Sequence, residues 1–525
     1  MAHINRAGVL SIALLCLLAL VALPACKKST PAATSGSTAT SPAPFEDGWP
    51  GMPVPGEAPS FSVPPSEQFT LSNGLPVTAI QRGSVPLVHL RLNIYSGSSA
   101  DPAGKEGLAV FTADMMNEAT TSRGALEISD ELQRMASSVQ LSSGLSSSAL
   151  SINCLEDKFA DTLALARDIL EHPTFPEDDI ERVRGDRKNR LLTQRDNPGT
   201  INYAVFAKLL YGDHYAGRPT AGSATSLDAI ERSDMVSWHQ HAWTPANAGL
   251  VVVSRLPADH VKSALELGLG SWAPAAATPP VASLITPDPT RGVQVYWVDR
   301  PGASQSYIQV GSVSPAFNAE KHQAWSLGNM VLGGQFSSRL NLNLREDKGF
   351  TYGARTSVWD GPHGGMFRAR SSVRTATTGP ALFEFFKELT DIVDSRPITQ
   401  GEFDAVVSRS EQGYPGRFEN MGSVLGIFAG ADAQHRPAGW LSGHSGRVAA
   451  VSLEGAQAAI AQLVDPANLV VVVVGDWNAV VESPERADGS PRPVTVTVGD
   501  HIRGLNLGDV AFLDEEGVPT IEPAR

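Results

Sequence analysis

The sequence predicts an α+β protein made of two homologous halves, each with helices packed on a largely antiparallel sheet. Three observations indicate this fold. The chain has 525 residues, too many for a single hydrophobic core. Short apolar patterns typical of strands are interspersed with amphipathic patterns typical of helices. A set of landmarks also recurs once, in the same order, at an offset of roughly 220 residues.

The repeated landmarks are a pair of strands, an amphipathic helix and a closing apolar strand. In the first half they fall at 77–94, 159–170 and 250–253, and in the second half at 293–313, 382–393 and 469–474. In both halves the tripeptide Pro-Ala-Asn leads into the closing strand. Three landmarks in one order predict two copies of one domain, each a layer of helices on a sheet.

Composition and pattern divide the chain into six predicted segments. They are a lipoprotein signal peptide (1–26), a Pro/Ser/Thr-rich tether (27–65), an N-terminal domain (66–273), a linker (274–290), a C-terminal domain (291–480) and an extension (481–525). In the extension, 494–498 has the pattern of an added strand.

The N-terminal segment predicts export and a lipid anchor. Arg6 precedes an apolar run at 9–22 that is short for a membrane span. The run ends in Leu-Pro-Ala-Cys, which resembles the lipobox of bacterial lipoproteins, where the cysteine, here Cys26, is acylated and becomes the mature N-terminus. Lys27, in place of an aspartate, favours the outer membrane facing the periplasm. A plain secretory signal with an incidental cysteine is the alternative.

Charge and cysteine content exclude two other classes of protein. The net charge is −14 and no basic stripe is present, which argues against a nucleic-acid partner. Beyond Cys26 the only cysteine is Cys154, so neither an intrachain disulfide nor a thiolate zinc cluster is expected. Cys154 lies in an alternating apolar pattern and is predicted to be a buried strand residue.

The first half resembles the pitrilysin/insulinase family of zinc peptidases. Gly97-Ser98, then Gly107-Leu108-Ala109 and Met115, match the frame of the family's zinc helix. In family members this helix carries His-x-x-Glu-His, whose histidines bind zinc and whose glutamate is the general base. The resemblance covers roughly residues 66 to 480, most of the chain after the signal peptide.

The metal-binding residues of that family are missing from the matching positions. Val110 and Asp114 stand where the two histidines belong, and Ala113 stands where the glutamate belongs. The third ligand, a glutamate on a later helix, falls near Arg190, where neither it nor its two neighbours is acidic. These are positions of a degenerate zinc motif, and the chain is predicted to bind no metal.

The second half keeps another family feature. The segment 332–340 and the following Leu-Arg-Glu-Asp-Lys-Gly-Phe-Thr-Tyr, 344–352, are similar to the family's Gly-Gly, Ser-Arg-Leu and Arg/Tyr segment. The resemblance implies that Arg345 holds substrate carbonyls and that Tyr352 helps to stabilise the oxyanion. A guanidinium and a phenol both donate hydrogen bonds to charge on oxygen. The alternative is a surface arginine and a half-buried strand tyrosine.

A chain that lacks the zinc residues but retains Arg345 and Tyr352 resembles one subunit of a split peptidase. In the bacterial branch related to mitochondrial processing peptidase, two chains form a clamshell, and this chain would form half of it. The resemblance implies a heterodimer with a zinc-bearing family paralogue, zinc in the partner, and peptide substrates that add a strand to a sheet edge.

The sequence is compatible with one other function and argues against another. The fold also serves as architecture in subunits of the respiratory bc1 complex, so a non-enzymatic peptide-binding or structural envelope lipoprotein is the alternative. A peptidase acting alone is disfavoured, because no Gly-x-Ser-x-Gly, no Cys/His pair and no other zinc motif occurs. His239 and His241 are two positions apart on a predicted helix and point to different faces, so they are not expected to share a metal.

Overall fold

The computed structural model describes residues 61–273, 285, 292–482 and 495–524. The predicted signal peptide, Cys26 and most of the predicted tether and linker lie outside these residues. Within the described part of the chain, no helix is both long and apolar enough to cross a bilayer. All of the described residues belong to the compact unit that begins at Ser60.

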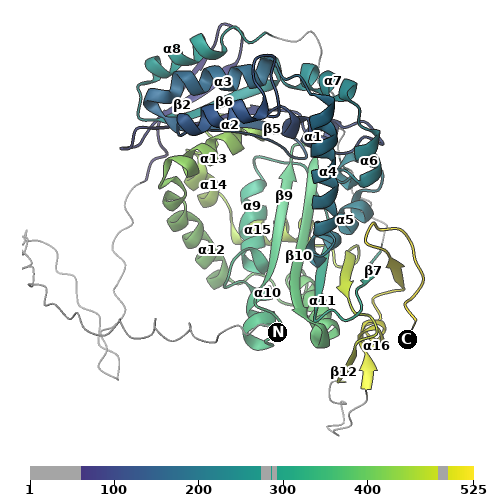
Figure 1. The fold of residues 1–525 in the computed structure, drawn as a ribbon. Helices are drawn as coiled ribbons and strands as arrows, with labels where there is room; N and C mark the ends of the chain where they lie inside the picture. The colour runs from purple at the N-terminus through teal and green to yellow at the C-terminus, as the bar shows by residue number, and fades with distance from the viewer. Residues whose placement is uncertain (1–60, 274–284, 286–291, 483–494, 525) are drawn as a thin grey trace, which may run out of the picture. The chain divides into compact units, whose positions relative to one another are not determined.

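Strands form one six-stranded sheet in each half of the chain (Figure 1). The N-terminal sheet consists of β1 (Glu67–Thr70), β2 (Pro76–Gln81), β3 (Leu87–Ile94), β4 (Ser138–Ser143), β5 (Ser148–Leu155) and β6 (Ala248–Ser254). The C-terminal sheet consists of β7 (Gln294–Asp299), β8 (Gln305–Ser314), β9 (Ala354–Gly361), β10 (Gly364–Arg374), β11 (Val470–Gly475) and β14 (Val510–Leu513). A separate pair, β12 (Val480–Glu482) and β13 (Thr495–Thr497), is antiparallel.

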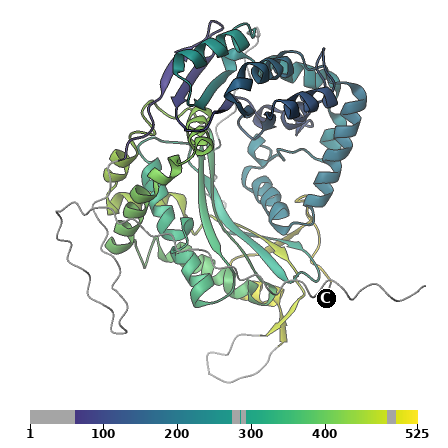
Figure 2. The same ribbon diagram turned by 60° about the vertical axis from the view of Figure 1, so that its left-hand side comes forward.

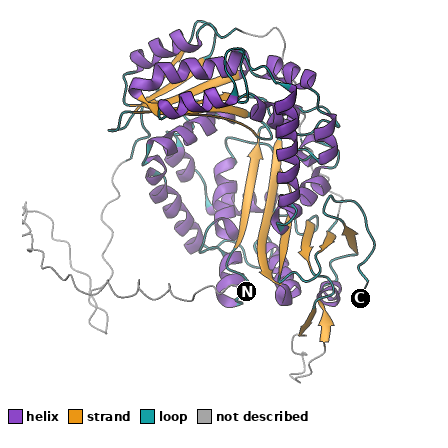
Figure 3. Cartoon of the chain, viewed as in Figure 1, coloured by secondary structure: helices purple, strands orange, loops and turns teal. Residues whose placement is uncertain are grey.

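Helices pack on these sheets in both halves (Figure 3). The N-terminal half contains α1 (Leu108–Met115), α2 (Ala125–Arg134), α3 (Phe159–Glu171), α4 (Glu177–Gln194), α5 (Pro198–Tyr211), α6 (Ala224–Ala229), α7 (Arg232–Ala242) and α8 (Ala258–Leu269). The C-terminal half contains α9 (His322–Asn329), α10 (Arg339–Asn341), α11 (Thr378–Asp391), α12 (Gln400–Gly413), α13 (Met421–Ala433), α14 (His444–Ala449), α15 (Leu453–Leu463) and α16 (Val498–Gly504). Two π-helical turns, η5 (Met330–Gly334) and η6 (Leu342–Asp347), flank α10, and the short helix η8 (Pro415–Phe418) precedes α13.

The two sheets have matching strand orders, which confirms the predicted α+β fold of two homologous halves. The orders are β1-β2-β6-β3-β5-β4 and β14-β7-β11-β8-β10-β9. Most neighbouring strands are antiparallel, and the exceptions are the pairs of β2 with β6, β7 with β11 and β7 with β14. The sixth strand of the second sheet, β14, comes from the segment after residue 480. Of the pattern predicted as an added strand at 494–498, residues 495–497 form the short β13 and Val498 begins α16, while residue 494 lies outside the described residues.

The closing strands β6 and β11 are buried along their whole length. Their sequences are runs of valine and leucine, the composition expected of strands that are covered on both faces. In β11, Val471 and Val473 join the core of the C-terminal half. Val470, Val472 and Val474 point to the other face and belong to a second apolar cluster. Each closing strand therefore requires a cover on both sides.

The second cover comes from the opposite half. Helix α5 of the N-terminal half packs on β8 and β11, and its Val205 and Phe206 lie in the cluster with the outer valines of β11. Helix α13 of the C-terminal half packs on β3 and β6, with Val424 and Leu425 against Val251. Figure 2 shows this arrangement from a second direction, with the yellow-green α13 beneath the strands of the N-terminal half. Each half thus contributes one helix that packs on the sheet of the other half.

Buried asparagines hold these exchanged helices to the sheets. The Asn202 side-chain amide on α5 donates to the carbonyl oxygens of Val472, at 2.8 Å, and Tyr307, at 3.2 Å. Asn93 on β3 donates to the Ala429 carbonyl at 2.8 Å and to Asp432 on α13 at 2.7 Å. Hydrogen bonds of this kind fix the position of a helix more specifically than apolar contact alone.

Replacing Phe206 by alanine tests the packing of α5 on the C-terminal sheet. The ring is fully buried between α5 and the C-terminal sheet, so we expect Phe206→Ala to lower the free energy of unfolding by about 3–5 kcal/mol. Urea denaturation followed by circular dichroism measures this. Phe383→Ala is the control, because Phe383 is half exposed on α11 and should cost much less. If both variants lose the same free energy of unfolding, Phe206 does not hold α5 on the C-terminal sheet.

Candidate functional site

The zinc-motif frame in the first half lies at the start of α1 and has a structural role. Gly107 takes a left-handed φ of 95°, and a Cβ there would lie 2.8 Å from the Ala221 carbonyl oxygen. The Asp101 carboxylate accepts hydrogen bonds from the backbone N–H groups of Gly107, at 2.8 Å, and Ala109, at 2.9 Å. Burial raises the pKa of Asp101 to about 7, although these hydrogen bonds oppose the shift. The Gly-Leu-Ala frame therefore starts a buried helix whether or not a metal is present.

Asp114, one of the positions that match the zinc ligands, is part of an ion pair. Arg187 on α4 donates to the Asp114 carboxylate at 2.7 Å and to the Ala221 carbonyl at 3.1 Å. Its side chain is only 6% exposed and its guanidinium lies 5.5 Å from the centre of the Phe111 ring. Burial lowers the pKa of Arg187, and the Asp114 carboxylate opposes that shift. Arg190, predicted at the third-ligand position, is 4.0 Å from Asp114 and mostly exposed.

This arrangement does not fit zinc. Val110 and Ala113 have no donor atom, and the one carboxylate, Asp114, already binds a guanidinium. A structural or catalytic zinc ion needs three or four nitrogen, sulfur or oxygen ligands from the protein. Within the ranges that the structure describes, no three histidine, cysteine, aspartate or glutamate side chains gather in a way that could hold a metal ion. Sequence reasoning missed Arg187, although α4 carries a visible cluster of basic residues.

The structure brings Arg345 and Tyr352 together in the second half. Arg345 lies in η6 and donates to the backbone carbonyl of Tyr352 at 3.2 Å. It also pairs with Glu346 at 3.0 Å, and its guanidinium stacks 4.6 Å from the centre of the Phe336 ring. Tyr352 is 91% exposed and Phe336 is 55% exposed. Sequence reasoning gave Phe336 no role, but it completes an exposed patch with Arg345 and Tyr352, which we call the Arg/Tyr patch.

The arginine of the Ser-Arg-Leu motif has a structural role. Arg339 is buried and donates two hydrogen bonds to the Glu402 carboxylate, both at 2.6 Å, and one to the Pro397 carbonyl at 2.9 Å. Burial acts to raise the pKa of Glu402, but hydrogen bonds from Arg339 and Thr399 outweigh it and bring the pKa to about 2. Arg339 therefore joins α10 to the start of α12. It lies near the Arg/Tyr patch in sequence, but its contacts are structural.

Cys154, His239 and His241, the other candidate residues of the sequence, lie in structural positions. Cys154 is buried in β5, and burial raises the pKa of its thiol to about 11. His239 is hydrogen-bonded to the Leu170 carbonyl at 2.7 Å, whereas His241 is exposed and contacts the Ser237 carbonyl at 2.6 Å. The two imidazoles thus make separate contacts.

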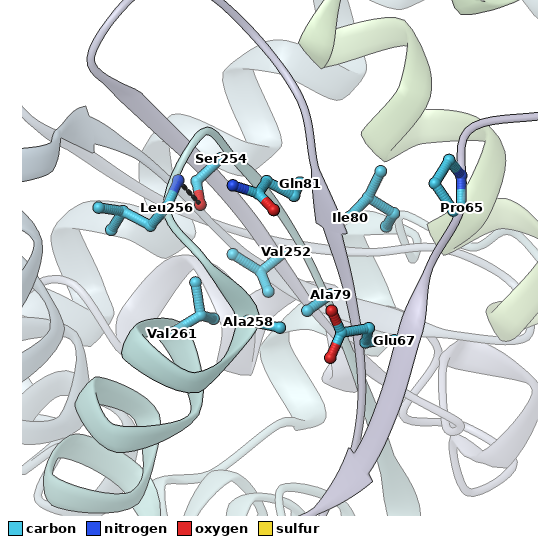
Figure 4. A pocket seen from close by; sticks show the side chains of 10 residues that line it. All are labelled: Pro65, Glu67, Ala79, Ile80, Gln81, Val252, Ser254, Leu256, Ala258 and Val261. Atoms are coloured by element: carbon cyan, nitrogen blue, oxygen red, sulfur yellow. Dashed lines mark hydrogen bonds between the residues drawn. The ribbon is translucent and has the colours of Figure 1, made fainter.

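A small cavity of about 140 Å³ lies among β1, β2, β6 and α8 (Figure 4). Its walls are mostly aliphatic, and Glu67 is the only carboxylate in them. Ser254 accepts a hydrogen bond from the Leu256 backbone N–H at 3.2 Å. The volume is below that of typical ligand pockets, and no second acid or base faces Glu67 in the cavity wall. We assign it no chemistry.

Comparison with known proteins defines the family. Residues 77–222 match the family described as insulinase (peptidase family M16), and residues 229–410 match the peptidase M16 inactive domain. The chain therefore belongs to the insulinase, or pitrilysin, family of peptidases. In its N-terminal half the zinc-motif positions hold Val110, Ala113 and Asp114, and the Asp114 carboxylate is paired with Arg187.

Individual relatives are distant in sequence. An uncharacterized zinc protease of Mycobacterium leprae is 23% identical over 297 residues, which is 55% of this chain and 65% of the relative. This chain thus spans slightly less than two thirds of that relative's length.

Solved structures share the fold. The peptidase M16 inactive domain from Pseudomonas fluorescens has a TM-score of 0.74 and 21% identity, and the match covers 80% of this chain and 100% of that one. A protease from Helicobacter pylori has a TM-score of 0.72 and 19% identity, with 78% and 99% covered.

Removing Asp114 tests the ion pair at the former metal position. Asp114→Ala leaves a buried guanidinium without its partner, so we expect a loss of about 2 kcal/mol in unfolding free energy, below the ~3–5 kcal/mol of a fully buried pair. Chemical denaturation measures the loss. Asp186→Ala on α4 is the matched control, because Asp186 is mostly exposed and 3.9 Å from its partner Arg182. If both variants are equally stable, Arg187 does not depend on Asp114.

Proposed function

We propose that this protein is the zinc-free subunit of a two-chain metallopeptidase. It would close the peptide chamber and present Arg345 and Tyr352 to the zinc site of a family paralogue. The observation that carries the proposal is the contrast between its halves. Asp114, at a zinc-ligand position, is paired with Arg187, whereas the Arg/Tyr patch is formed and exposed.

The exposure of the patch supports a role toward a partner chain. In the described part of the chain, the Arg345 side chain contacts Phe336, Glu346 and the Tyr352 backbone, all within the same segment. Tyrosine and arginine are enriched at the centres of protein interfaces, where the ring excludes water and the guanidinium forms several hydrogen bonds. A phenol that is 91% exposed would be available to an oxyanion in a neighbouring subunit's site.

The position of the patch also suits a bound peptide. Tyr352 precedes β9, which is the last strand of the C-terminal sheet and is paired on one side only, with β10, in the described part of the chain. An extended peptide can add to such an edge through main-chain hydrogen bonds, with loose sequence preference. A peptide on β9 would begin beside Arg345 and Tyr352.

An activity assay of the pair tests the role of the patch. The purified chain is mixed with a zinc-bearing family paralogue from the same organism, and the cleavage of a quenched fluorescent peptide is followed. We expect Arg345→Ala and Tyr352→Phe each to lower kcat by roughly 100-fold, the typical effect of losing one oxyanion donor. Arg374→Ala, an exposed arginine of the same half, is the control.

Two outcomes would contradict the proposal. If both variants leave the rate of the pair unchanged, the patch has no part in the reaction. If the chain binds peptides but accelerates no partner, the non-enzymatic envelope protein is the better description.

We also propose that the protein is anchored to the bacterial outer membrane through lipid on Cys26 and faces the periplasm. The support is the lipobox-like sequence that ends at this cysteine. Two or more acyl chains give stable membrane binding. We expect Cys26→Ala to move the protein from the membrane fraction to the soluble fraction, and Cys154→Ala to leave it in place. Unchanged fractionation of Cys26→Ala would refute the anchor.

A further inference from the structure

A large cavity of about 1090 Å³ lies among α9, α12, α13 and α14 of the C-terminal half. The four helices lie together at the left and centre of Figure 1. None of the residues assigned above to the metal position or to the Arg/Tyr patch lines it. Its volume is at the upper end of the range for pockets that enclose a drug-sized ligand.

The repeat relates this cavity to the degenerate metal position. In the order of elements, α9 and α12 correspond to α1 and α4, and each pair is in contact. In the N-terminal half, Asp114 on α1 and Arg187 on α4 form an ion pair. In the C-terminal half the equivalent helices line the cavity, and their side chains there include Gln323 and Arg409.

Positive charge dominates the cavity wall. Arg409, Arg417, Arg436 and Arg447 line it, and no aspartate or glutamate does, although the chain carries a net charge of −14. Behind the wall, Asp360 lies 3.4 Å from Arg436 and 2.6 Å from His322.

A second carboxylate, Glu411 on α12, follows Ser410 of the wall in sequence. One of its oxygens accepts a hydrogen bond from Ser445 at 2.6 Å, and the other is buried without a hydrogen-bond partner. Among the described residues, no carboxylate forms an ion pair with Arg409, Arg417 or Arg447. The wall therefore carries an excess of fixed positive charge.

Two of these arginines each have a buried nitrogen donor without a hydrogen-bond partner. The Arg436 side chain is 6% exposed, and its Nη1 group has no hydrogen-bond partner. It stacks on the Phe317 ring at 3.4 Å. The Nε of Arg447 is also buried without a partner, and its guanidinium stacks on Trp440 at 3.6 Å. Burial lowers the pKa of both arginines. Buried donors of this kind are costly unless an acceptor satisfies them, and an anionic ligand would supply one.

We propose that this cavity binds an acidic peptide segment, with aspartate or glutamate side chains on the arginines. The arginines stand on four separate elements of the wall (α12, η8, the loop after α13, and α14), an arrangement that suits a ligand with several acidic groups. Amide, hydroxyl and aliphatic side chains lie between them and suit a peptide main chain: Gln323, Ser326, Gln412, Gln434, Ile427 and Leu441. A long polyanion such as nucleic acid would be repelled by the negative charge of the rest of the chain.

Binding to the purified chain alone tests this proposal, so its outcome is independent of the proposed peptidase pair. A fluorescein-labelled ten-residue peptide of alternating glutamate and alanine is titrated with the protein, and fluorescence anisotropy is measured. We expect saturable binding that weakens with salt. The same peptide with glutamine in place of glutamate should bind at least about tenfold more weakly, since it lacks charge-assisted hydrogen bonds.

Variants distinguish the cavity from general surface charge. We expect Arg447→Gln to weaken binding of the acidic peptide by about tenfold and Arg417→Gln/Arg447→Gln by more. Arg374→Gln removes an equal charge from outside the cavity and should bind like the wild type. Circular dichroism reports whether each variant folds, and the exposed Arg417 provides a single variant that leaves buried packing intact.

Three results would overturn the proposal. The first is equal affinity for the glutamate and glutamine peptides. The second is an unchanged affinity in the folded Arg417→Gln and Arg447→Gln variants. The third is displacement of the peptide by inorganic phosphate at the peptide's own concentration, which would make the cavity a site for small anions instead.

Discussion

The structure depends on the burial of its two closing strands on both faces. Strands β6 and β11 have no polar face, so each must be covered by its own half and by something else. The cover is a helix from the opposite half: α5 on β11 and α13 on β6. Because Asn202 and Asn93 make side-chain hydrogen bonds across these contacts, the exchange is specific as well as apolar. Each half therefore relies on a helix of the other half to cover its closing strand.

Two residues of the family's sequence signature, Gly107 and Arg339, have structural roles. Gly107 is required by a left-handed backbone and by close contact with a carbonyl, and Arg339 is required by its bonds to Glu402 and the backbone. These residues serve folding and are independent of metal chemistry. A chain can therefore lose its zinc ligands and keep a recognisable family frame. The Asp114–Arg187 pair indicates how the vacated position is stabilised, because a guanidinium supplies the positive charge that a metal ion would bring.

The two halves differ in the groups that their equivalent helices carry. An ion pair joins α1 to α4, whereas α9 and α12 line a cavity with arginines in its wall. The Arg/Tyr patch faces solvent at the start of an edge strand.

The sequence by itself determined the repeat, and hence the two sheets, because strand and helix periods are local properties. It also determined the absence of donors at Val110 and Ala113, which is a matter of side-chain chemistry. Only the tertiary structure decided that Arg187, one turn before Arg190, reaches Asp114, because the rotation of α4 against α1 depends on packing. The same holds for the cavity around Arg436, whose residues come from elements distant in the chain. Periodicity specifies which face of an element is apolar, but the partner of that face is selected by contacts that no local pattern encodes.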